Sequence, residues 1–81
     1  MDGRVQRYFF DLAENGRYIP DREGADLPDE ASACDLAKRK VRQVVRSRLR
    51  EGSLPVGGYV SIRLGCGERL MFLPYRDAMS S

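Results

Sequence analysis

The sequence predicts an α+β domain of element order ββαββ, in which a four-stranded antiparallel sheet carries one amphipathic helix packed on one face. The first observation behind this prediction is an alternation of apolar and polar residues with a period of two, which occurs near both ends of the chain and is typical of strands. The second is a change to the helical period of 3.6 in the middle third. Turn-forming residues between the paired segments indicate two hairpins, one on each side of the helix.

The first hairpin begins at residues 7–12, where the sequence RYFFDL alternates as a strand does. Asn15-Gly16 follows, and this pair favours a type I′ turn because both residues accept the positive φ that the turn requires. The second strand is therefore predicted over residues 17–20, which end in a proline.

The helix is introduced by DREGADLPD at 21–29, which has the composition of a turn, with Gly24 at a position suited to positive φ. Asp29 is the predicted N-cap, the helix is predicted over 30–51, and Gly52 is expected to end it as the C′ residue. The residues that fall within one arc of the helical wheel are Ala33, Ala37, Val41, Val44, Val45 and Arg48. This arc predicts the helix face that packs on the sheet.

The second hairpin consists of predicted strands at 59–64 and 69–75, joined by a turn at 65–68. The last strand is apolar on both faces, although one helix covers only one side of a sheet and the other side should be polar. The surplus predicts that a second copy of the chain covers the open face or an edge. The alternative is that these are the scattered exposed apolar groups usual in small proteins. The candidate dimer-interface residues are Phe9, Met71, Leu73 and Tyr75.

The chain has 81 residues, which predicts a single domain over 1–81 with an ordered core over roughly 7–76. We expect residues 1–5 and 77–81 to fray. A hydrophobic content of 42% and a charged content of 32% are those of a folded domain. The sequence has no stretch apolar enough for a signal peptide or a membrane span, so we expect a cytoplasmic protein without a membrane partner.

Charge is distributed unevenly, although the formal net charge is only +2. Residues 21–30 hold five acids and one base, a net charge of −4, and residues 35–51 hold seven bases and two acids, a net charge of +5. The candidate polyanion-binding residues form a stripe opposite the apolar arc: Arg39, Arg42, Arg46 and Arg50. Such a stripe can bind phosphates or an acidic protein partner. It is also the arrangement that the helix dipole favours on a solvated helix face.

Arg48 is a separate case because it lies inside the apolar arc. Its aliphatic stem can cover the core while its guanidinium reaches solvent or the last carbonyls of the helix. The alternative is an ion pair with an acid of the 21–30 segment, in the same chain or in a second copy.

Catalytic and metal sites are not indicated. The chain has no histidine, which is the commonest general base, and its cysteines, Cys34 and Cys66, do not have metal-ligand spacing. Cys34 is interpreted as a small core residue and Cys66 as part of a hairpin turn. The acids at 21–30 lack the order of an EF-hand loop and are explained by turns and N-capping. We therefore expect no enzyme, no cofactor and no metal.

Several segments together resemble a family of small uncharacterised bacterial proteins that is catalogued as a domain of unknown function. They are RYFFDL, NGR, the D-x-x-G-x-x-L-P-D run at 21–29, GYVSIR and the closing LPYRDAM. The resemblance covers residues 7–79 and implies a stand-alone ββαββ domain, with no established activity or cofactor. This chain differs in having Tyr75 where phenylalanine is common and in a more basic helix.

Two functions remain open at this point. The first is a small non-enzymatic homodimeric protein-interaction module. The second is a nucleic-acid-binding or antitoxin-like regulator that acts through Arg39, Arg42, Arg46 and Arg50. The likeness to antitoxins rests on the order of elements alone, and a shared fold does not fix a function.

Overall fold

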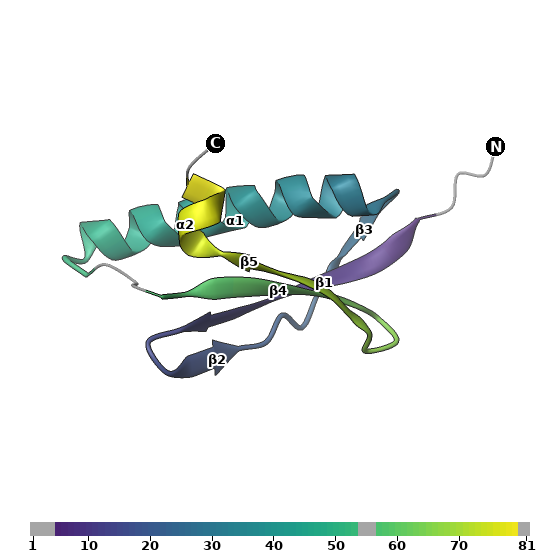
Figure 1. Cartoon of the computed structure of the whole chain (residues 1–81), viewed down its shortest axis with the longest axis horizontal. Helices are drawn as coiled ribbons and strands as arrows, with labels where there is room; N and C mark the ends of the chain where they lie inside the picture. Colours follow the sequence, from purple (N-terminus) through teal and green to yellow (C-terminus); the bar gives the residue numbers. More distant parts are fainter. Residues whose placement is uncertain (1–4, 54–56, 80–81) are drawn as a thin grey trace.

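The computed structural model describes residues 5–53 and 57–79 and has the predicted α+β architecture, with α1 lying across one face of an antiparallel sheet (Figure 1). The ββαββ order is confirmed, with two additions, the short strand β3 before the helix and the short helix α2 at the end. The elements are β1 (Gln6–Glu14), β2 (Arg17–Ile19), β3 (Ala25–Leu27), α1 (Glu30–Arg50), β4 (Tyr59–Leu64), β5 (Arg69–Pro74) and α2 (Tyr75–Met79).

The strands follow the order β2-β1-β4-β5, and β3 also pairs with β1. β1 is long enough, at nine residues, to pair with two short strands along the same edge. β2 pairs with Leu12–Glu14, and β3 pairs with Gln6–Tyr8. Between these two stretches the Asp21 carboxylate accepts a hydrogen bond from the Phe10 N–H at 3.0 Å, so a side chain takes the place of a strand there.

Local signals in the sequence set the ends of the elements. The Asn15-Gly16 turn has φ values of 52° and 75°, as a type I′ turn requires. Asp29 caps α1, with its carboxylate accepting the Ser32 N–H at 2.8 Å. At the other end Gly52 has φ 82°, its N–H donates to the Leu49 carbonyl, and the Ser53 N–H donates to the Arg48 carbonyl, which is a Schellman motif. These predictions are confirmed.

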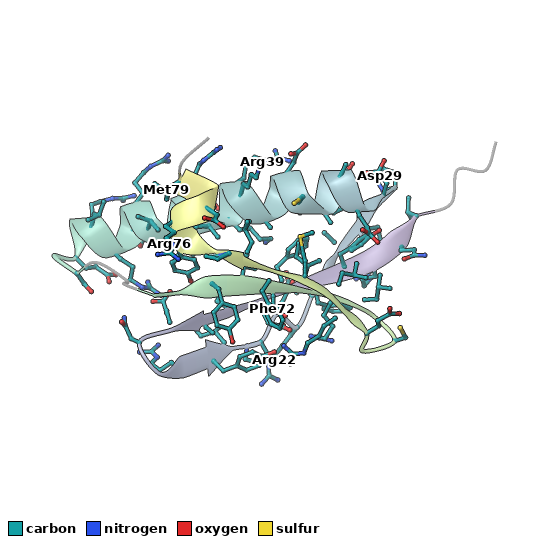
Figure 2. The ribbon with its side chains drawn as sticks, in the orientation of Figure 1. Arg22, Asp29, Arg39, Phe72, Arg76 and Met79 are labelled. Carbon is teal, nitrogen blue, oxygen red and sulfur yellow. The ribbon has the colours of Figure 1, made fainter. Side chains whose placement is uncertain are left out.

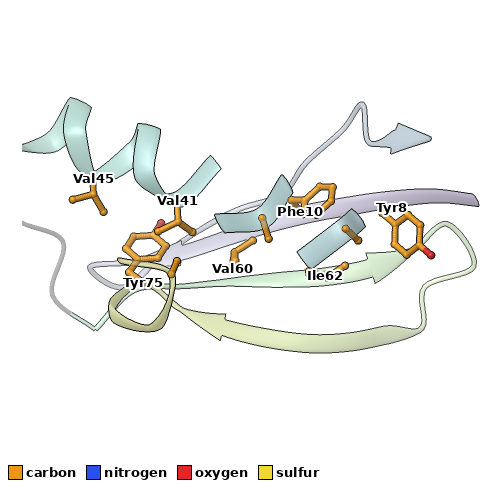
Figure 3. Packing of buried hydrophobic residues seen from close by; sticks show 10 residues of the cluster. Tyr8, Phe10, Val41, Val45, Val60, Ile62 and Tyr75 are labelled. Atoms are coloured by element: carbon orange, nitrogen blue, oxygen red, sulfur yellow. The ribbon is translucent and has the colours of Figure 1, made fainter. Parts of the chain in front are cut away.

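The core lies between α1 and the sheet (Figure 3). Helix α1 buries Ala33, Ala37, Val41 and Val45, as the apolar arc predicted, and small side chains there allow close approach to the sheet. From the strands, Tyr8, Phe10, Val60 and Ile62 point into the same layer, each at most 4% exposed.

Residues 77–79, predicted to fray, belong to a short helix. Strand β5 stops at Pro74, one residue earlier than predicted, and Tyr75 and Ala78 of α2 are buried. The Tyr75 ring lies against Gly58, where an added Cβ would be 2.6 Å from the ring. Because this packing needs a distant glycine, the local sequence could not indicate it. The predicted fraying of residues 1–4 and 80–81 concerns residues outside the described part of the chain.

Candidate functional site

The sheet has one face under α1 and one face that none of the described helices covers. On the open side lie Phe9, Asp11, Ser61, Arg63 and Phe72, which alternate along β1, β4 and β5 with the core residues. In Figure 2 the labelled Phe72 lies on the opposite side of the sheet from α1 and its Arg39. The open face is therefore a surface to which three strands contribute side chains.

Asp11 is the centre of this face and is fully buried, with 0% of its surface exposed. Its carboxylate accepts hydrogen bonds from Arg63 Nε at 2.9 Å and Arg63 Nη2 at 3.2 Å. It also accepts the Tyr18 hydroxyl at 2.9 Å and the Asp21 backbone N–H at 2.9 Å. A buried carboxylate with this many donors is satisfied, so Asp11 acts as an anchor for the loop and for Arg63.

The pKa values of the two carboxyls on this side follow from these contacts. Burial alone raises the pKa of Asp11, but the hydrogen bonds from Arg63, Asp21 and Tyr18 outweigh it and hold that pKa below its ordinary range. Burial likewise raises the pKa of Asp21, and the N–H groups of Phe10, Glu23 and Gly24 reverse this and lower it. Both groups are ionised near neutral pH.

Aromatic rings and guanidinium groups cover the open face around Asp11. The Arg63 guanidinium lies over the Phe9 ring at 4.7 Å, so Phe9 is shielded. Tyr59 and Phe72 meet edge to face, with ring centroids 5.4 Å apart. Phe72 is nevertheless 56% exposed, which makes it the prominent apolar group of this face.

Strand β5 forms an edge of the sheet, and none of the strands in the described chain pairs with its outer side. The Tyr75 N–H donates to the Gly58 carbonyl at 2.9 Å, and the register then pairs Leu73 with Val60 and Met71 with Ile62. Hydrogen-bonded and non-hydrogen-bonded pairs alternate in an antiparallel ladder. The backbone N–H and C=O groups of Leu73 and Met71 therefore bond to β4, while those of Phe72 point outward from the edge.

The structure separates the residues predicted for a dimer interface. Met71 and Leu73 pack against the core, with the Cys34 thiol 3.7 Å from the Met71 sulfur, and Tyr75 is 4% exposed. Tyr75 therefore belongs to the chain's own interior, whereas Met71 and Leu73 are half-buried and pack on the helix-covered side of β5. Phe9 does lie on the open face, under Arg63. Sequence reasoning placed Phe72 on the other side of its strand, because an apolar strand carries no signal for which residues face the helix.

A polar cluster lies at one end of the layer between α1 and the sheet, and it accounts for the position of Arg48 in the apolar arc. Glu14 is 6% exposed and accepts hydrogen bonds from Arg48 Nε and from the Tyr75 hydroxyl, both at 2.7 Å. Arg48 therefore pairs with Glu14, and not with an acid of the 21–30 segment as the alternative interpretation had it. Burial raises the pKa of Glu14, but Arg48 and Tyr75 outweigh this and lower it. Burial and the Glu14 carboxylate raise the pKa of the Tyr75 phenol.

The basic face of α1 lies away from the sheet, as Arg39 shows in Figure 2. Arg39, Arg46 and Arg50 are exposed, and Arg42 is half-buried with a partner of its own. A shallow pocket there is lined by Asp35, Lys38, Arg39 and Arg42. Asp35 thus lies at the N-terminal end of the predicted stripe, and within the stripe Arg42 is already engaged.

The acids of the 21–30 segment serve the local structure. Asp21 holds the loop, Asp29 caps α1, and Asp26 forms an ion pair with Arg7 at 3.0 Å. Among the described residues, no group of three or more His, Cys, Asp or Glu side chains is placed to hold a metal ion. None of the described helices has the length and apolar content to cross a bilayer.

The fold and this surface define a small α+β domain with one helix-covered face and one open face. A family model described as a domain of unknown function (DUF6894) matches residues 7–76. The chain therefore belongs to this family, as its resemblance to an uncharacterised domain family implied. No curated protein and no solved structure matches it.

Proposed function

We propose that the protein is a small, non-enzymatic, homodimeric protein-interaction module that associates through the exposed β5 side of its sheet. The observation that carries this proposal is Phe72, a large apolar side chain that is 56% exposed on a strand whose outer edge pairs with none of the described strands. Exposed apolar groups next to an unpaired strand edge favour association with another chain. The buried carboxylates support a structural role, because Asp11 and Glu14 are already held by arginine and tyrosine.

Sedimentation equilibrium tests the homodimer directly. We expect twice the mass of one chain at micromolar concentration, and a shift to the single-chain mass when Phe72 is replaced by Glu. The matched control is Leu49→Glu, since Leu49 is also 56% exposed but lies on α1, away from the β5 edge. A single-chain mass for the wild type at all concentrations up to about 1 mM would contradict the proposal.

A second candidate function is nucleic-acid binding by the basic face of α1. Arg39, Arg46 and Arg50 are exposed, which supports it, and several phosphate contacts would make affinity fall steeply with salt. The test is a titration with duplex and single-stranded DNA at about 50 and 200 mM salt. Binding that Arg39→Glu with Arg46→Glu abolishes, and that the exposed control Arg17→Glu retains, would support it. Absence of binding at the lower salt would remove it.

A further inference from the structure

We infer that the dimer forms by antiparallel pairing of β5 with β5 of a second copy, with Phe72 opposite Phe72, so that the two sheets become one continuous sheet. This inference deepens the proposed function and rests on it, because it names the edge, the register and the partner. It has three requirements. The backbone of β5 must offer free hydrogen-bonding groups, its side chains must become buried on pairing, and the other edge of the sheet must be unable to pair in the same way.

The backbone of β5 is self-complementary about Phe72. Its N–H and C=O both point outward, since the neighbours Met71 and Leu73 bond to β4. A two-fold axis at this position lets each Phe72 N–H donate to the Phe72 carbonyl of the other copy. In the same register the Pro74 carbonyl lies opposite Leu70 of the second copy. Pro74 has no N–H, so the Leu70 carbonyl gains no donor and the ladder ends at this pair.

The side chains gain from the same register. Directly opposite residues of an antiparallel pair have Cβ atoms about 4.5–5.5 Å apart and lie on one face. The two Phe72 rings, each 56% exposed in the single chain, would then cover each other on the open face. The Tyr59 ring already lies edge to face on Phe72 at 5.4 Å, so the paired rings would extend an aromatic cluster that exists in one chain.

The other edge of the sheet cannot pair in this way. It consists of two strands of three residues each, β2 and β3, separated by a loop that starts at Pro20. The middle of β1 on that side is already occupied by the Asp21 carboxylate. By contrast, the Met71-Phe72-Leu73 stretch of β5 carries no charge. One self-complementary edge per chain gives a closed dimer and no further growth.

Amide hydrogen exchange combined with sedimentation tests the inference on the unmodified protein. We expect the Phe72 amide to be protected at concentrations where the dimer forms and to exchange at least tenfold faster after dilution to the single chain. The Met71 and Leu73 amides, which bond to β4, serve as internal controls that stay protected in both states. A dimer whose Phe72 amide exchanges freely would overturn the edge pairing and leave the homodimer intact. A single chain at all concentrations would overturn both.

A pair of substitutions separates the backbone from the ring. Phe72→Ala removes the ring and keeps the N–H, whereas Phe72→Pro removes both. We expect the dimer dissociation constant of the proline variant to exceed that of the alanine variant by tenfold or more, since a bond is lost in each copy. Equal constants for two variants with the same circular dichroism would overturn the inference. If the proline variant does not fold, the exchange experiment decides.

Discussion

The two faces of the sheet are buried by different means, and adjacent residues of β1 show the contrast. Phe10 is 4% exposed and lies under α1 among valine and alanine side chains. Its neighbour Asp11 is 0% exposed although it points to the face that α1 does not cover, because Arg63, Tyr18 and the loop at Asp21 enclose it. Burial in a chain this small does not require a second apolar layer. A charged residue with enough donors around it can be the inner part of an otherwise open surface.

Lowering the pH should have the largest effect on the free energy of unfolding, because three carboxyls with lowered pKa values contribute to it together. The pKa values of Asp11, Asp21 and Glu14 lie below the ordinary values of 3.8 for Asp and 4.5 for Glu. As the pH falls, these carboxyls therefore bind protons in the unfolded chain before they do so in the folded chain. Their contribution to the unfolding free energy is present above the ordinary pKa values and is lost as the pH falls below them. Urea unfolding from pH 7 to pH 3 measures the loss. We expect Asp11→Asn to flatten the pH dependence, and an unchanged curve would contradict the account of the open face.

Replacing Asp11 by Ala should lower the unfolding free energy by about 3 kcal/mol, because it leaves the Arg63, Tyr18 and Asp21 donors without their acceptor. The control is Asp26→Ala, which removes a carboxylate whose ion pair with Arg7 is half exposed, and we expect a loss below about 1 kcal/mol. Urea titration at pH 7 measures both. Equal losses would show that the open face is no more than a solvated surface.

On the helix-covered face, Val41→Ala should cost about 2 kcal/mol, since Val41 is 0% exposed and the deletion removes buried methyl groups and leaves a cavity. The control on the same helix is Leu49→Ala, because Leu49 is 56% exposed. Thermal unfolding followed by circular dichroism measures both variants. We expect the Val41 loss to be independent of salt and pH, unlike the loss at Asp11.

The smallest effects should come from two tyrosine hydroxyls that donate to carboxylates on opposite faces. Tyr75→Phe removes the bond to Glu14 and leaves a buried acceptor with one donor fewer, for which we expect about 1 kcal/mol. Tyr18→Phe removes the bond to Asp11, but Tyr18 is 50% exposed and water can replace its hydroxyl, so we expect about 0.5 kcal/mol or less. A larger loss for Tyr18 than for Tyr75 would reverse the ranking of the two sites.

The sequence predicts the parts of this fold that depend on neighbouring residues. Asn15-Gly16, the Asp29 cap and the Gly52 end of α1 are local signals, and the apolar arc of α1 is periodic. The strand β3 is not predictable in this way, because three residues carry no period and pair only where β1 extends beyond β2.

The candidate site was harder to predict for a related reason. Which side of β5 faces α1 depends on its register with β4, and that register shifts at an irregularity between Ile62 and Arg63. An apolar strand offers no alternation that would reveal this, so Phe72 was missed. The partner of Arg48 was missed because Glu14 lies on a strand far from it in sequence.

The free side of β5 has a geometric consequence for the rest of the molecule. In the proposed dimer the two-fold axis would run perpendicular to the sheet, so the long helices of both copies would lie above the same face. The outward guanidinium groups of the two helices would then form two rows on one side of the joined sheet. The Tyr59 and Phe72 rings of both copies would lie together on the other side. A polyanion long enough to reach both helices would meet twice the charge that one helix offers.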